Sequence, residues 1–225
     1  MGNLFTQEYP KKILPIYEDS KKFFNKEIKK GVSISNTKAF SGSSLEECAR
    51  YTILNIIDDL KTKYPDIDLG LEPKNHYIKS DFIGHSDERL DQHVYLNGKY
   101  VYLEENRAWV DKPFYTLKRG VIRNIMLSCP SKLSKNIKFG MLSYCLDIKQ
   151  EIINTCDYTQ GYGDRLKCFS LTGRSRSTKV NGKEVNWYET GFLDSTIKSY
   201  VSYIYNTLEG AINETSDSVP RRLSA

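Results

Sequence analysis

Two acidic residues and an amide beside a predicted β-hairpin are the residues best suited to chemistry in this sequence. Asn97-Gly98 stands between two runs in which apolar and polar residues alternate. An Asn-Gly pair in that setting predicts a two-residue hairpin turn. Counting outward from the turn places Asp91 opposite Glu104, with their Cβ atoms roughly 5 Å apart. Asn106 falls on the same face, because strand residues two apart point the same way.

The hairpin is therefore expected to have one polar, aromatic face and one apolar face. The polar face would hold Asp91, His93, Tyr95, Tyr100, Tyr102, Glu104 and Asn106. The apolar face would hold Leu90, Val94, Leu96, Val101 and Leu103, with Gln92 among them.

Two facing carboxylates repel each other unless one is protonated or a cation lies between them. Carboxylate oxygens suit Mg²⁺, which proteins hold with one or two carboxylates plus waters and phosphate oxygens. Such an ion lowers the pKa of a bound water and stabilises the leaving oxygen of a phosphodiester. Asn106 could then orient the attacking water. The alternative is a solvated sheet face, on which two opposed acids cost at most roughly 1 kcal/mol.

The sequence resembles the PD-(D/E)xK nuclease superfamily, and in particular Type II restriction endonucleases. In that family an acidic residue follows an apolar one, and acid-x-Lys lies on the next strand. Leu90-Asp91 matches the first part without its proline, and Glu104-Glu105-Asn106 matches the second with Asn in place of Lys. The resemblance implies a Mg²⁺-dependent, site-specific endonuclease acting on double-stranded DNA. It also implies that Asp91, Glu104 and Asn106 are catalytic and that both acids bind the metal.

Some positions of the family pattern have more than one candidate here. Many members add an acid from the preceding helix, which is Glu47 or Glu46 in this chain, and we take Glu47 as a third metal ligand. Asp66 of Pro65-Asp66 and Asp81 are weaker alternatives to Asp91 as the first acid. The positive charge of the missing lysine could come from Arg107, Lys112 or Lys118. His93 either assists the attacking water or contacts a phosphate, or it is a hydrogen-bonded structural histidine.

Basic and hydroxyl side chains gather in Gly173–Lys179, which places three cations and three hydroxyls in seven residues. Such side chains contact phosphate oxygens, and arginine also reads base edges or a narrow minor groove. A second basic cluster precedes Ser128. Side-chain amides can form paired hydrogen bonds with adenine. The predicted DNA-binding residues are Arg174, Arg176, Lys179, Lys118, Arg123 and Asn181.

Apolar periodicity predicts helices at 20–30, from Ser43 or Ser44 to Pro65, at 112–128, at 147–154 and from Asp194. The start at Ser44 rests on a capping box with Glu47. Strands are expected at the hairpin, at 76–78, 136–146 and 166–172, and a polar loop at 173–191.

This order of elements predicts an α/β fold with a mixed central β-sheet flanked by helices. The family resemblance makes it restriction-endonuclease-like. We expect a single nuclease domain over 1–225. Its catalytic core would cover about 43–146, its DNA-recognition excursion about 158–191, and its C-terminal helix about 194–213.

Composition limits the partners and the compartment. The net charge of +5 favours an anionic partner. The five cysteines have no metal-ligand spacing, which suggests reduced, buried thiols in a cytoplasmic protein. Because no run of about 18 apolar residues is present, we expect no membrane association. The family resemblance implies a bacterial protein. A palindromic target would require a homodimer, for which the apolar stripe of 112–128 or of 194–208 could form the interface. The alternative functions are a DNA-binding protein without catalysis and a thiol hydrolase using His76, His85 or His93.

Overall fold

The computed structural model describes residues 34–110, 121–146, 165–170, 175–180, 183–188 and 194–217, and the statements below concern these ranges. The described strands form a five-stranded sheet in the order β1-β2-β3-β4-β5. Their bounds are β1 (Leu69–Leu71), β2 (Gln92–Leu96), β3 (Lys99–Val110), β4 (Leu133–Leu146) and β5 (Leu166–Ser170).

The sheet is mixed, as predicted. β1 pairs with β2, and β2 with β3, in antiparallel orientation, whereas β3 pairs with β4, and β4 with β5, in parallel. Parallel neighbours need a crossover on one face of the sheet, and residues 121–128, just before β4, are helical. The strand predictions at 136–146 and 166–172 are confirmed, while 76–78 contributes only an isolated bridge between Ile78 and Glu88.

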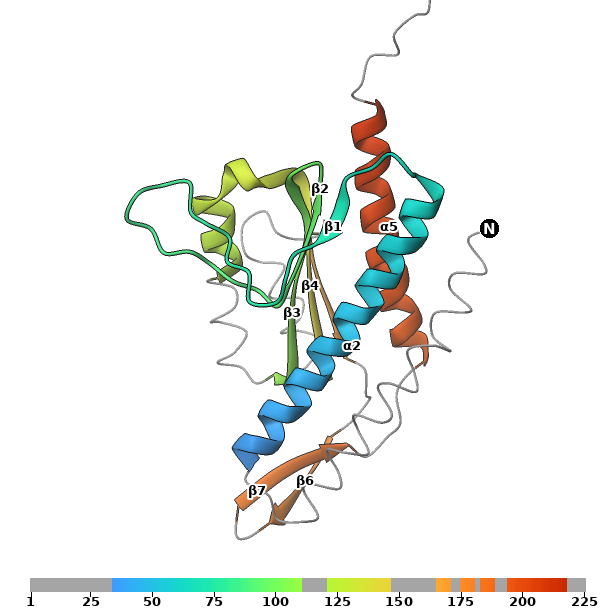
Figure 1. Ribbon diagram of the computed structural model, residues 1–225. Coiled ribbons are helices and arrows are strands. Elements are labelled where there is room, and N and C mark those ends of the chain that lie inside the picture. Colours follow the sequence, from blue (N-terminus) through green and yellow to red (C-terminus); the bar gives the residue numbers. More distant parts are fainter. Residues whose placement is uncertain are drawn as a thin grey trace, which may run out of the picture.

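Helices cover both faces of the sheet (Figure 1). α2 (Ile34–Lys63) and α5 (Asp194–Asp217) share one hydrophobic core with the first face, which includes Val94, Tyr102 and Leu142. The helix at 121–128 packs with Leu103 and Phe139 in a second core on the opposite face. The predicted α/β class, a central sheet flanked by helices, is thus confirmed.

The apolar stripes of the two long helices account for this packing. The predicted positions Leu45, Ala49, Ile53, Ile56, Ile57 and Leu60 of α2 are all buried. α2 begins at Ile34 rather than at Ser43 or Ser44, so the Ser44–Glu47 pair lies inside the helix and is no capping box.

The apolar stripe of α5 is also buried in the core of the protein. Ile197, Val201, Ile204 and Leu208 are fully buried in the core that α5 shares with α2. Core packing therefore accounts for this stripe without a subunit interface.

The hairpin turn has the predicted conformation, because Asn97 and Gly98 have φ of 49° and 73°. The predicted register is wrong beyond Tyr95. Tyr95 pairs with Tyr100 but Val94 pairs with Tyr102, so Val101 is an extra residue in β3. Such a bulge shifts every later pair by one residue.

The bulge changes both predicted faces. Gln92, not Asp91, lies opposite Glu104. Val94, Leu96, Val101 and Tyr102 join the core with α2 and α5, whereas Leu90, Leu103 and Tyr100 join the second core. The division into one polar and one apolar face was therefore incorrect.

The polar segment predicted as a loop at 173–191 instead contains a two-stranded sheet. β6 (Ser175–Val180) pairs antiparallel with β7 (Lys183–Tyr188), and in Figure 1 this ribbon lies toward the N-terminal end of α2. The helices predicted at 20–30 and 147–154, and the first part of 112–128, fall outside the described residues. Among the described helices, none is both long and apolar enough to span a membrane.

Candidate active site

Glu104 is a charged side chain of the described sheet that is completely buried. It lies in β3 on the face covered by α2 and α5. Its Oε2 accepts a hydrogen bond from the Tyr102 hydroxyl. Its Oε1 accepts hydrogen bonds from Asn106 Nδ2 and, at 3.0 Å, from the Tyr200 hydroxyl of α5. Both carboxylate oxygens are therefore bonded.

Burial raises the pKa of Glu104 to about 7. The three hydrogen bonds oppose the shift, and the nearby Asp91 carboxylate adds to it. A carboxyl group with this pKa exchanges its proton near neutral pH, as catalytic acids and metal-binding acids do.

Gly140 provides the space for this arrangement. It pairs with Glu104 across β3 and β4. A Cβ atom at Gly140 would lie 1.9 Å from the Tyr102 hydroxyl oxygen and 3.0 Å from Glu104 Oε2. The Tyr102–Glu104 hydrogen bond thus requires a glycine here.

Asn106 joins the two strands that form the site. Its backbone N–H donates to Asp91 Oδ2 at 2.7 Å. Its side-chain Oδ1 accepts from Gln92 Nε2 at 3.1 Å, while its Nδ2 donates to Glu104. The described contacts therefore let Asn106 position both acids, and its role in orienting a water stays a prediction.

A third acid reaches the site from α2. Burial raises the pKa of Glu46, and the Asp91 carboxylate raises it further. Asp91 thus influences both Glu46 and Glu104, although it is offset from Glu104 by one register position. Unlike Glu104, both Asp91 and Glu46 are partly exposed. The three carboxylates concentrate negative charge where α2 crosses the start of β2.

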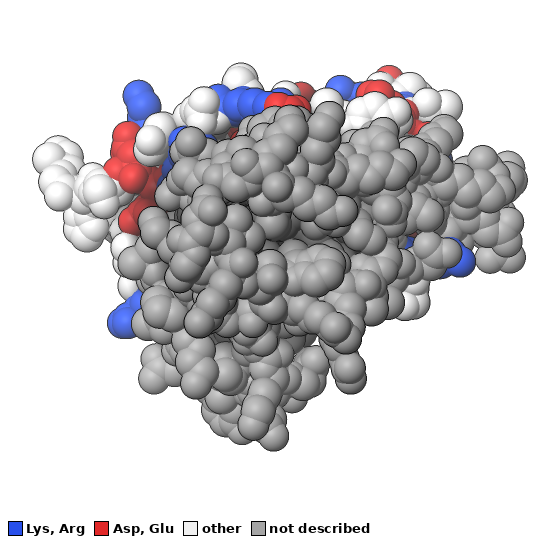
Figure 2. Space-filling model, turned by 90° about the horizontal axis from the view of Figure 1, so that it is seen from below, with Lys and Arg blue, Asp and Glu red and all other residues white. Residues whose placement is uncertain are grey.

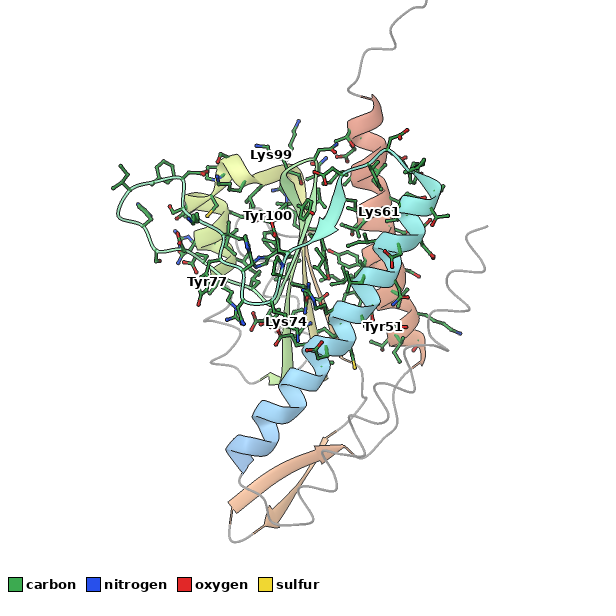
Figure 3. The ribbon with its side chains drawn as sticks, in the orientation of Figure 1. Tyr51, Lys61, Lys74, Tyr77, Lys99 and Tyr100 are labelled. Carbon is green, nitrogen blue, oxygen red and sulfur yellow. The ribbon has the colours of Figure 1, made fainter. Side chains whose placement is uncertain are left out.

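Glu47, the residue chosen from the sequence, does not join this group. Its exposed side chain pairs with Lys74, which Figure 3 shows beside α2. A helix turns by about 100° per residue, so neighbouring residues of α2 face different surroundings. The structure therefore favours Glu46 over Glu47 as the helix acid.

Sequence reasoning missed a cation beside the site. Arg50 lies one helical turn after Glu46, and its Nη1 donates to Gln92 Oε1 at 3.4 Å. Burial lowers the pKa of Arg50, and the Glu46 carboxylate opposes this. The spacing of Glu46 and Arg50 at i and i+4 was the available signal. Of the earlier candidates, Lys112 and Lys118 lie outside the described residues, and the side chain of Arg107 is not described.

His93 has a structural role. It is buried, and its Nε2 accepts the backbone N–H of Leu90 at 3.1 Å. Burial lowers its pKa to about 3, so the ring is neutral at physiological pH.

The other candidate acids lie elsewhere. Asp81 accepts hydrogen bonds from the backbone and side chain of Ser131, which lower its pKa. Asp66 is exposed in the connection between α2 and β1. Neither residue contacts Asp91 or Glu104 in the described hydrogen-bond network.

The predicted DNA-binding residues are only partly described. Arg123 is exposed on the helix at 121–128. Arg176 and Lys179 lie in β6, in register with Trp187 and Glu184. Lys118, Arg174 and Asn181 fall outside the described residues. In the view of Figure 2, described basic and acidic residues are intermixed along the visible edge.

The donor set has the chemistry that Mg²⁺ prefers, but it is not a closed metal cage. No group of three or more His, Cys, Asp or Glu side chains within the described ranges is arranged to hold a metal ion. Magnesium needs only one or two protein carboxylates. Asp91 and Glu46 fit this need with the least rearrangement, whereas Glu104 would have to release a hydrogen bond.

The comparisons with known proteins give one match of the overall fold. No family model matches the sequence, and no curated protein matches it. Among solved structures, the chain is similar to NucC of P. aeruginosa ATCC27853 in its cAAA-bound form. The TM-score is 0.48 at 9% identity, over 88% of this chain and 91% of NucC.

Substituting the two adjacent glutamates of α2 tests which one belongs to the site. For the Mg²⁺-dependent DNA cleavage that the sequence resemblance implies, we expect Glu46→Gln to lower the rate by at least about 10- to 100-fold, because loss of even an outer-shell partner of a metal ligand costs that much. Glu47→Gln should change it less than about twofold, because an exposed ion pair contributes little. Cleavage rates of the two variants at saturating DNA and varied Mg²⁺ concentration measure both effects. Equal losses would remove Glu46 from the site.

Proposed function

We propose that this protein is a Mg²⁺-dependent endonuclease that hydrolyses phosphodiester bonds of double-stranded DNA. The observation that supports it most is Glu104, a buried carboxylate with a raised pKa, beside the partly exposed acids Asp91 and Glu46. A fold that only needed a stable sheet would gain nothing from burying this charge. The order of helix, hairpin and parallel strand agrees with the PD-(D/E)xK resemblance of the sequence.

Each residue then has a defined part in the reaction. Asp91 and Glu46, which are partly exposed, would hold the ion, and Glu104 would add a third carboxylate once it is deprotonated. When bound, Mg²⁺ activates the attacking water and stabilises the leaving oxygen. Asn106 holds Asp91 and Glu104 in place through its backbone and side chain.

Arg50 takes the place of the missing family lysine in this proposal. Asn106 is uncharged, so a cation for the scissile phosphate must come from another element. Arg50 is held next to the acids by its bond to Gln92. A guanidinium keeps its charge even when partly buried, and it binds phosphate oxygens through paired N–H groups.

The finer parts of the proposal concern specificity and assembly. We propose a Type II restriction enzyme that acts as a homodimer on a palindromic site, with one active site for each strand. Arg174, Arg176, Lys179 and Asn181 would read the DNA from the segment that contains β6 and β7. Lys118 and Arg123 would contact phosphates from the helix before β4.

Incubating the purified full-length protein with plasmid DNA tests this function. With Mg²⁺ we expect discrete fragments, and with a chelator we expect intact plasmid. A smear of fragments would support a nuclease but contradict site specificity. Intact plasmid over a range of divalent ions and sites would contradict the endonuclease proposal.

One observation favours a second candidate function, that of a DNA-binding protein without catalysis. Both oxygens of Glu104 already accept hydrogen bonds from Tyr102, Asn106 and Tyr200. If these bonds persist when Mg²⁺ is added, Glu104 is a structural residue, and the protein binds DNA without cutting it. The two cysteines whose side chains the structure describes do not favour a thiol hydrolase, because Cys48 and Cys129 are buried and burial raises the pKa of Cys129.

A further inference from the structure

A long groove follows α5 on the side of β4 and β5. A cavity of about 630 Å³ lies between the C-terminal half of α5 and the end of the sheet that holds the hairpin turn. A second, of about 620 Å³, lies between the N-terminal half of α5 and the two strands. Both are lined by Lys138, Asn206 and Thr207, so they form one continuous depression. We call it the α5 groove.

The α5 groove is strongly basic. Its charged lining residues are Lys99, Lys135, Lys138, Lys167, Lys198 and Glu214. The single acid, Glu214, accepts two hydrogen bonds from Asn136 Nδ2. Lys167 lies over the rings of Phe169 and Tyr203, which orients its ammonium group at the groove. The lining thus combines positive charge and hydroxyl and amide groups with an apolar floor that includes Leu96, Val101 and Leu133.

The length of the groove fits a chain of phosphates better than one phosphate. Lys198 and Glu214 mark its two ends on α5. At 1.5 Å per residue they are about 24 Å apart along the helix. One strand of duplex DNA carries a phosphate every 3.4 Å of helix axis. Although the strand winds around that axis, a groove of this length can contact several of its phosphates.

α5 connects the α5 groove with the candidate active site. Tyr200, between the groove residues Lys198 and Ser202, donates its hydroxyl hydrogen to Glu104. One face of α5 therefore contacts the buried acid while another lines the groove. Lys99 lies at the far end, which Figure 3 shows at the opposite end of the sheet from Lys74.

We propose that the α5 groove binds the sugar-phosphate backbone of double-stranded DNA flanking the site of cleavage. The choice of duplex DNA as the polyanion rests on the proposed function. Lysine and hydroxyl contacts to phosphates position the duplex without reading its sequence. The groove therefore contributes affinity and salt dependence, whereas sequence recognition comes from other residues.

Binding of a fluorescent 20-base-pair duplex, measured by anisotropy in chelator at several salt concentrations, tests this proposal on the full-length chain. For the Lys135→Ala/Lys198→Ala variant we expect affinity to fall about tenfold or more. The slope of log K against log salt should decrease by about one for each lysine removed. The control is Lys61→Ala/Lys79→Ala, which removes two exposed lysines outside the groove and should leave the slope within error of the unmodified protein.

The outcomes separate this proposal from the nuclease proposal. An unchanged slope and affinity in the Lys135→Ala/Lys198→Ala variant would refute the groove. Tighter binding of a 20-base-pair RNA duplex than of the DNA duplex would refute the choice of partner. Because chelator prevents cleavage, a reduced slope supports the groove even if the plasmid assay shows no cutting.

Discussion

Replacing Asp91 with asparagine is expected to abolish Mg²⁺-dependent DNA cleavage while leaving DNA binding intact. Asp91 is partly exposed and raises the pKa of both Glu46 and Glu104. The substitution therefore removes the carboxylate that lies near both Glu46 and Glu104 and that would hold the ion together with them. Because bound metal supplies several kcal/mol of transition-state stabilisation, the cleavage rate should fall at least about 1000-fold, or roughly 4 kcal/mol.

The same substitution should slightly strengthen DNA binding, since it removes a negative charge that faces the phosphates. The asparagine Oδ1 can still accept the Asn106 N–H, so the fold should be retained. Asp81→Asn is the matched control. It weakens the hydrogen bonds to Ser131 and lowers stability, with no loss of cleavage. Cleavage by Asp91→Asn at the unmodified rate would place the active site elsewhere.

Replacing Glu104 with glutamine is expected to stabilise the protein at alkaline pH and to eliminate cleavage. The pKa of Glu104 is about 7 in the fold, against an ordinary value of 4.5. Between these values the folded state keeps a proton that the unfolded state releases, so stability falls as pH rises through this window. Above pH 7 Glu104 is ionised in the folded state as well, and the free energy of unfolding is lower by the full cost, on the order of 3 kcal/mol.

Glutamine cannot ionise, so the Glu104→Gln variant avoids this cost. Its free energy of unfolding should exceed that of the unmodified protein by about 3 kcal/mol at pH 8 and match it near pH 4.5. Urea unfolding at the two pH values measures the difference. Glu47→Gln, a control in an exposed ion pair, should change stability by less than about 0.5 kcal/mol at both.

His93 provides the opposite slope on the acid side. Its pKa falls from 6.5 to about 3 in the fold, so the unfolded state binds the additional proton. Stability is therefore lost as pH falls below 6.5. Between pH 4.5 and 6.5 the effects of His93 and Glu104 oppose each other. The Glu104→Gln variant should consequently show a rise in stability with pH that the unmodified protein lacks.

A stabilised but inactive Glu104→Gln variant would be the signature of an active site, where a fold keeps a costly group for its chemistry. If the variant is instead less stable at pH 8, Glu104 is ionised and well compensated in the fold. If it still cleaves DNA, its carboxylate takes no part in the reaction.

The sequence predicted the elements of this fold better than their pairing. The stripes Leu45–Leu60 and Ile197–Leu208 identified two buried helices, and Asn97-Gly98 identified the turn. The bulge at Val101 was not predictable, because an extra strand residue leaves no local signal. That residue moved Gln92 into the position expected for Asp91.

Other errors had signals in the sequence. Asn181-Gly182 lies between the segments that form β6 and β7, and the same dipeptide had identified the first hairpin. Gly140, inside a predicted strand, indicated a close approach that proved to be the Tyr102–Glu104 pair. The choice between Glu46 and Glu47 had no such signal, because it depends on how α2 is rotated against the sheet.

Calorimetric titration of the metal-free protein with Mg²⁺ near pH 7, in buffers of different ionisation enthalpy, tests the central claim most directly. If Asp91, Glu46 and Glu104 hold the ion, binding should release a fraction of a proton from Glu104, because metal ligands must be deprotonated. Asp91→Asn should lose binding, and Glu104→Gln should lose the proton release. Mg²⁺ binding that is unchanged in both variants, or no binding to the unmodified protein, would contradict the account.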